Sequence, residues 1–265
     1  MGSKSATNVQ SLFQSAHQEG ALSAASLQAL SVVDVGQQVQ NALGVSLADV
    51  QTSEGVLVAM LIDDSGSIRY ANNEQHVRDG HNLVLESLGG SKAKNSILVH
   101  CRYLNGLVLY EYVPLDQAVK MDDTNYQATG GTPLYDKSVV LLGTVIAKAK
   151  ESADLGIPVR TITLIVTDGH DEHSTRFVPK DVASIVKDML HQENHIIAGM
   201  GIDDGGMTDF RRVFREMGIR DEWILTPGNT PKEIRNAFNA FSSTAVAASQ
   251  TAQSFSKTAM GGFGQ

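Results

Sequence analysis

The chain has 265 residues, of which 42% are apolar and 19% are charged, and its formal net charge is −8 at pH 7. This length suits one large domain or two small ones, and it buries enough surface to fold without disulfides. The excess of 29 acidic over 21 basic residues argues against a nucleic-acid partner, which would require a basic face. No apolar run approaches the ~20 residues of a membrane-spanning helix, so no membrane insertion is expected.

The compartment is predicted from cysteine content and from the start of the chain. Cys101 is the single cysteine, so an internal disulfide is impossible and a reducing compartment is the simpler interpretation. No basic start followed by an apolar stretch indicates a secretion signal. We therefore expect a cytoplasmic protein.

Composition divides the chain into three segments. Residues 1–52 are rich in Ser, Ala and Gln and carry short helical patterns, which predict an N-terminal helical extension that docks on the main domain or frays. Residues 53–241 alternate strand and helix patterns and form the predicted main domain. Residues 242–265 predict a helical tail that becomes disordered.

The main domain is predicted to have an α/β fold. Asn105-Gly106 between two apolar runs is a strong signal for a tight antiparallel hairpin. The other apolar runs alternate with helical patterns, which predicts a Rossmann-like, doubly wound, mostly parallel sheet with one antiparallel edge strand and helices on both faces. The predicted strands are 56–62, 96–103, 107–113, 161–167, 195–201 and 222–225; the predicted helices cover about 77–89, 132–153, 182–190 and 210–217, with a last helix after the capping box at 230–233.

Ligands bind such sheets at the carboxyl ends of the strands. Directly after the first buried strand, Asp63, Ser65 and Ser67 alternate, and Gly66 allows the backbone to turn tightly between the serines. One carboxylate and two hydroxyls are hard oxygen donors that suit Mg²⁺ or Mn²⁺ rather than zinc. The competing interpretation is a simple Asx or Ser turn.

Two further loops place polar side chains at the same predicted edge. Thr132 stands in Gly130-Gly131-Thr132-Pro133 before a helix, where taken alone it is expected to be an N-cap. Asp168 follows the strand 161–167 directly, and taken alone it is a routine turn residue.

Taken together, these fragments resemble the metal-ion-dependent adhesion site of von Willebrand factor A (VWA) domains. The resemblance covers about residues 54–240, and all five motif positions are present: Asp63, Ser65, Ser67, Thr132 and Asp168. It implies that the two serines and the threonine bind a divalent cation directly, with Mg²⁺ expected and Mn²⁺ or Ca²⁺ as alternatives. The aspartates are implied to act mainly through water. It also implies an open coordination position for a partner's Asp or Glu.

The resemblance implies a protein-binding module and no enzymatic activity. Intracellular proteins similar to this one often act beside AAA+ ATPases or as scaffold subunits, so a partner of that kind is expected. One alternative is a metal-dependent phosphatase or other hydrolase, although haloacid-dehalogenase-type enzymes carry a second acid where this chain has Ser65. Another is a structural subunit with a vestigial metal site.

Other polar features near the site have less specific interpretations. The run from His170 to His173 is expected to be a solvated loop, and Tyr126 is a candidate for partner contact. The glycines at 199 and 201 have the wrong spacing for a dinucleotide loop. Nine acidic residues are expected at one edge of the sheet, where they would attract a cation: Asp63, Asp64, Asp122, Asp123, Asp168, Asp171, Glu172, Asp203 and Asp204.

Overall fold

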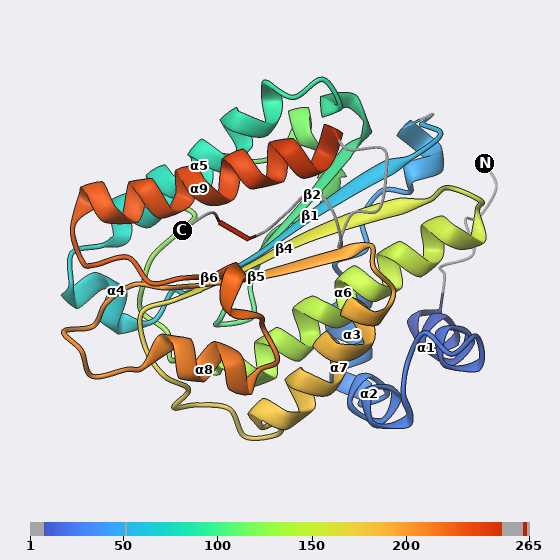
Figure 1. Cartoon of the computed structure of the whole chain (residues 1–265), viewed down its shortest axis with the longest axis horizontal. Helices are drawn as coiled ribbons and strands as arrows, with labels where there is room; N and C mark the ends of the chain where they lie inside the picture. Colours follow the sequence, from blue (N-terminus) through green and yellow to red (C-terminus); the bar gives the residue numbers. More distant parts are fainter. Residues whose placement is uncertain (1–7, 51, 251–261, 264–265) are drawn as a thin grey trace.

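The computed structural model describes residues 8–50, 52–250 and 262–263 and is built on one six-stranded sheet with the order β3-β2-β1-β4-β5-β6 (Figure 1). The strand β1 is buried along its whole length and pairs in parallel with both of its neighbours, β2 and β4. Only β3 runs antiparallel, which confirms the predicted edge hairpin. The strands are β1 (Gly55–Ile62), β2 (Ile97–Tyr103), β3 (Val108–Pro114), β4 (Val159–Thr167), β5 (His195–Gly201) and β6 (Ile224–Leu225).

Helices cover both faces of the sheet, as predicted (Figure 1). On one face, α5 (Glu74–Gly89) lies against α9 (Pro231–Gln250), and a Cβ on Gly80 would overlap the ring of Phe238. On the other face lie α6 (Leu134–Asp154), α7 (Pro179–His191) and α8 (Phe210–Glu216). Shorter elements are α4 (Gly66–Tyr70), η1 (Leu47–Val50), η2 (Lys94–Ser96), η3 (Leu115–Gln117) and η4 (Asp221–Trp223).

The glycines of β5 have a packing role. A Cβ on Gly199 would lie 2.6 Å from the Phe214 ring, and one on Gly201 would overlap the Phe210 ring. Both rings belong to α8, so these glycines allow that helix to approach the strand closely.

The N-terminal helices α1 (Val9–Gln18), α2 (Ala24–Leu30) and α3 (Val33–Gln40) pack onto the main domain. Gly143 of α6 marks a close approach, since a Cβ there would lie 2.7 Å from Leu30 and 3.6 Å from the tip of Phe13. The side chain of Phe13 is fully buried in the common core. These helices therefore share the core of the sheet domain.

Phe13→Ala should lower the free energy of unfolding of the whole domain by about 3–5 kcal/mol, because it empties a buried site between α1 and α6. Urea denaturation followed by far-UV circular dichroism measures this. A single transition displaced to lower urea is expected; an unchanged midpoint would contradict a shared core.

Two predicted boundaries differ in the structure. The last strand begins at Ile224 and not at residue 222, because Asp221–Trp223 forms a 3₁₀ turn. The predicted tail is helical to Gln250, and the prediction of disorder beyond it falls largely on residues 251–261 and 264–265, outside the described residues. Within the described ranges, no helix combines the length and the apolar character needed to cross a bilayer.

Candidate metal centre

The candidate site lies where β1 and β4 end side by side. Asp63 and Asp64 follow β1, and Asp168 follows β4, whose Val166 accepts a hydrogen bond from the backbone N–H of Asp63 at 3.1 Å. The three aspartates are 0%, 1% and 4% exposed, respectively. The parallel register thus brings together acidic residues that are a hundred positions apart in the chain.

Protein donors fix the carboxylate of Asp63 on both oxygens. Its Oδ1 accepts from the backbone N–H of Ser65 at 2.8 Å, and its Oδ2 accepts from the Thr167 hydroxyl at 2.6 Å and from the N–H of Asp168 at 3.3 Å. These bonds hold the carboxylate of Asp63 in one orientation and tie the loop after β1 to the end of β4.

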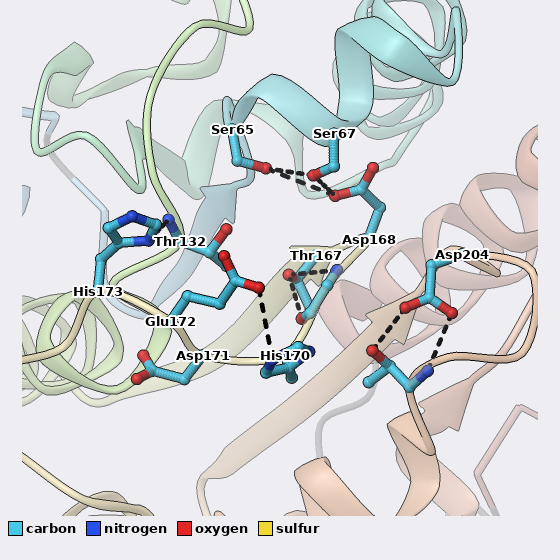
Figure 2. Close-up of polar contacts among 12 residues, drawn as sticks. Ser65, Ser67, Thr132, Thr167, Asp168, His170, Asp171, Glu172, His173 and Asp204 are labelled. Atoms are coloured by element: carbon cyan, nitrogen blue, oxygen red, sulfur yellow. Dashed lines mark hydrogen bonds and ion pairs between the residues drawn. The ribbon is translucent and has the colours of Figure 1, made fainter.

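The two serines and Asp168 converge at one point (Figure 2). Ser67 Oγ donates to Asp168 Oδ1 at 2.6 Å, Ser65 Oγ lies 2.8 Å from Ser67 Oγ, and Ser65 Oγ lies 3.5 Å from Asp168 Oδ1. Ser65 is buried and Ser67 is exposed, so the cluster opens to solvent on the side of Ser67. The structure therefore brings Asp63, Ser65, Ser67 and Asp168 together.

Thr132 reaches the same edge from the loop before α6. Two backbone hydrogen bonds join that loop to the loop that follows β1. The Gly66 N–H donates to the Gly130 carbonyl at 3.0 Å, and the Gly130 N–H donates to the Asp64 carbonyl at 2.9 Å. The side chain of Thr132 is 6% exposed, and Figure 2 shows it beside the strand end that carries Thr167 and Asp168.

The predicted N-cap role of Thr132 is wrong. The helix α6 begins at Leu134, and its N-cap position is Pro133, which makes no side-chain cap bond. Side chains from another loop cap α6 instead. The N–H of Tyr135 donates to Asp171 Oδ1 at 3.2 Å, and the N–H of Asp136 donates to Ser174 Oγ at 3.0 Å. Because a separate loop caps α6, the hydroxyl of Thr132 is not needed as a helix cap.

That separate loop contains the predicted solvated run from His170 to His173, and it has a structural role as well. His173 Nδ1 accepts from the N–H of Thr132 at 3.0 Å (Figure 2). The Thr132 carbonyl accepts from the N–H of Glu172 at 3.1 Å. The backbone of Thr132 is therefore held on both sides.

Electrostatics favour a cation at this point. Burial, and next the charge of Asp63, raise the pKa of Asp168 from 3.8 to about 7. The same two causes raise the pKa of Asp64 from 3.8 to about 6, with burial the larger. Burial also raises the pKa of Asp63, against the hydrogen bonds it accepts. Within the described residues, the hydrogen bonds that these three carboxylates accept come from neutral backbone N–H groups and hydroxyls.

The donor set suits a hard divalent cation. Across the described residues, no group of three or more His, Cys, Asp or Glu is arranged to hold a metal ion. The candidate set is of another kind, with serine and threonine hydroxyls beside two carboxylates. These oxygen donors fit Mg²⁺, Mn²⁺ or Ca²⁺ and offer no soft ligand for zinc or copper.

Solved structures identify the fold. No protein-family model and no curated protein matches the sequence. The von Willebrand factor domain of the type V pilus tip protein Mfa5 from Porphyromonas gingivalis is similar, with 11% identity and a TM-score of 0.53 over 76% of this chain and 98% of that one. The fold is VWA-like. The pilus adhesin SpaC from Lactobacillus rhamnosus GG (15% identity, TM-score 0.55) and proximal thread matrix protein 1 from the mussel byssus (14%, 0.51) share it over 74% and 73% of this chain. The matched parts make up 30% of SpaC and 47% of the byssus protein.

One residue of the VWA-like domain was predicted to contact a partner and is buried instead. Tyr126 is fully buried, and its hydroxyl donates to the backbone carbonyl of Asp63 at 2.5 Å. The hydrogen bond of Tyr126 thereby supports the backbone of the loop that follows β1. No signal in the sequence indicates this role, because the acceptor is a backbone atom sixty-three residues away.

Thr167 supports the candidate site through its hydrogen bond to Asp63, and the sequence analysis did not single it out. Thr167→Val should weaken Mg²⁺ binding about tenfold, because it removes the short hydrogen bond to Asp63 while keeping the side-chain shape. Thr163→Val is the matched control, since Thr163 lies on the same strand, and its buried hydroxyl has no partner among the described residues. Isothermal titration with Mg²⁺ measures both, and equal affinities in the two variants would contradict this role.

Proposed function

We propose that the domain is a protein-interaction module that binds its partner through a divalent cation at the ends of β1 and β4. Ser65, Ser67 and Thr132 would hold the cation directly, and Asp63 and Asp168 would act through water. Mg²⁺ is the expected ion, with Mn²⁺ or Ca²⁺ as alternatives. A carboxylate of the partner would fill the remaining coordination position.

One observation carries the proposal: three buried aspartates meet at a strand edge, and the hydrogen bonds that they accept within the described residues come from neutral backbone N–H groups and hydroxyls. Burying ionised carboxylates without a counterion is unfavourable. A divalent cation removes this penalty, and the two serine hydroxyls at the open side provide neutral oxygen ligands for it.

The residues suit binding better than catalysis. Both oxygens of Asp63 accept hydrogen bonds from the protein, which leaves it poorly placed as a nucleophile. The position two residues later, where a phosphatase of the aspartate-nucleophile type has its acid, is Ser65. A cation held by neutral hydroxyls would keep most of its charge and attract a carboxylate strongly. We therefore propose a non-enzymatic module.

The setting of the module remains a prediction of the sequence: the single cysteine predicts the compartment, and the family resemblance predicts the kind of complex and partner. It includes a cytoplasmic location, a role as adaptor or subunit of a larger intracellular complex, and an AAA+ ATPase or another complex subunit as partner.

Affinity capture tests the proposed function. The immobilised protein should retain a specific protein from native lysate in buffer with Mg²⁺ and release it on addition of EDTA. Hydrolysis of a generic phosphoester such as p-nitrophenyl phosphate should stay at background. Capture that survives EDTA would contradict the metal bridge, and Mg²⁺-dependent phosphate release would favour the hydrolase alternative.

A further inference from the structure

Three large, exposed apolar side chains belong to segments at the same end of the sheet as the candidate metal centre. Tyr70 is 88% exposed, Met207 81% and Leu107 64%, and these are three of the four most exposed large apolar residues in the described ranges. Exposed apolar groups that gather at one place indicate an interaction surface, and Tyr and Met are enriched in the cores of protein interfaces.

Tyr70 lies directly on the first loop of the site. It closes α4, the short helix that begins at Gly66 and contains Ser67. A Cβ on Gly66 would lie 3.5 Å from Cε2 of the Tyr70 ring, so the ring lies on the same side of α4 as Gly66. The exposed phenol therefore belongs to the same short helix as Ser67.

Leu107 belongs to a second loop that is attached to the site. It is at the tip of the β2–β3 hairpin, two residues after Asn105, whose N–H donates to Asp64 Oδ1 at 3.0 Å. The same asparagine accepts from the N–H of Leu107 at 2.8 Å. The hairpin tip is thereby fixed to the end of β1.

Met207 belongs to a third loop. This loop begins where Ile202 N–H donates to the Thr167 carbonyl at 2.9 Å, next to Asp168. The N–H of Met207 donates to Asp204 Oδ1 at 2.9 Å, and Figure 2 shows Asp204 in the same view as the serine cluster, on the side of Asp168.

We propose that Tyr70, Leu107 and Met207, here called the apolar rim, select a partner segment in which one Asp or Glu is flanked by large apolar side chains. The inference rests on the proposed function, since the carboxylate of that segment would bind the cation. Asp203 and Glu172, on loops of the same edge, add negative charge. This charge disfavours further acidic residues in the segment, so the occupant carries a single carboxylate near its centre.

Peptide display tests the rim while the partner is still unidentified. Random twelve-residue peptides on phage are panned against the full-length protein in Mg²⁺ and eluted with EDTA. We expect the eluted clones to carry one Asp or Glu with Leu, Ile, Met, Phe or Tyr within two positions. Acid-containing clones without apolar enrichment would overturn the rim and leave the proposed function intact. Apolar clones that resist EDTA, or no EDTA-eluted clones, would contradict the proposed function and with it the single-carboxylate segment.

Variants separate the rim from the metal site. Tyr70→Ser and Met207→Ser should each weaken binding of a selected peptide about tenfold and leave Mn²⁺ affinity unchanged, since neither side chain belongs to the proposed ligand set. Leu155→Ser is the matched control, because Leu155 is 53% exposed but follows the far end of the 21-residue helix α6. Equal peptide affinity in Tyr70→Ser, Met207→Ser and Leu155→Ser would overturn the rim.

Discussion

Asp63→Ala should abolish divalent-cation binding, with a loss of affinity of about 100-fold or more, and should abolish partner capture with it. The carboxylate organises the site, since it accepts hydrogen bonds from Ser65, Thr167 and Asp168 at once. Its removal leaves these donors unpaired and takes away a fully buried carboxylate. Isothermal titration with Mg²⁺ and capture from lysate measure the two losses.

Asp123→Ala is the control for a general effect of acidic charge. Asp123 is exposed in the loop before Thr132 and is one of the nine acidic residues assigned to this edge from the sequence. Its removal changes net charge by the same amount as Asp63→Ala and should leave Mg²⁺ affinity within about twofold, because salt screens exposed charges. Similar losses in both variants would show that diffuse charge, and not a defined site, attracts the cation.

Asp168→Asn should make the metal-free protein more stable at pH 8 and unresponsive to Mg²⁺. The pKa of Asp168 is about 7 in the folded chain against an ordinary value of 3.8, so the folded state binds the proton more tightly than the unfolded state does. The stability of the metal-free protein therefore falls as pH rises from about 4 to about 7. Removing the charge should recover roughly 2–4 kcal/mol of this loss at pH 8.

In the unmodified protein, the stabilisation produced by Mg²⁺ should increase as pH rises and so oppose this loss of stability. Protons compete with the cation for Asp168, so the rise in melting temperature produced by Mg²⁺ should be small at pH 5 and reach its full size above pH 7. Differential scanning calorimetry at pH 5, 6, 7 and 8, with and without Mg²⁺, gives both trends. A Mg²⁺ effect of equal size at every pH, or a destabilised Asp168→Asn variant, would contradict the electrostatic account.

The sheet was predictable from local pattern because its signals are strong and short in range. The apolar run of β1 has no polar interruption, and Asn105-Gly106 has the conformational freedom that a tight hairpin needs, with a φ of 97° at the glycine. The motif residues were also predictable in position, because strand ends in a parallel sheet meet at one edge. The site's cation and its direct ligands remain a proposal.

The supporting residues of the site were not predictable, because their partners are distant or belong to the backbone. Tyr126 is an aromatic residue in a polar stretch of sequence, yet its hydroxyl bonds a carbonyl of the β1 loop. Thr132 has the sequence context of a helix cap, but Asp171 and Ser174 take that role from a loop almost forty residues later. Such contacts depend on how two loops pack, and single-sequence periodicity does not report loop packing.

Direct titration with Mn²⁺, followed by electron paramagnetic resonance at pH 7.5, tests the central claim most directly. The account predicts one bound ion per chain, displaced by excess Mg²⁺ and lost in Asp63→Ala but retained in Asp123→Ala. Binding that persists unchanged in Asp63→Ala, or the absence of a saturable site in the unmodified protein, would contradict a metal centre at the ends of β1 and β4.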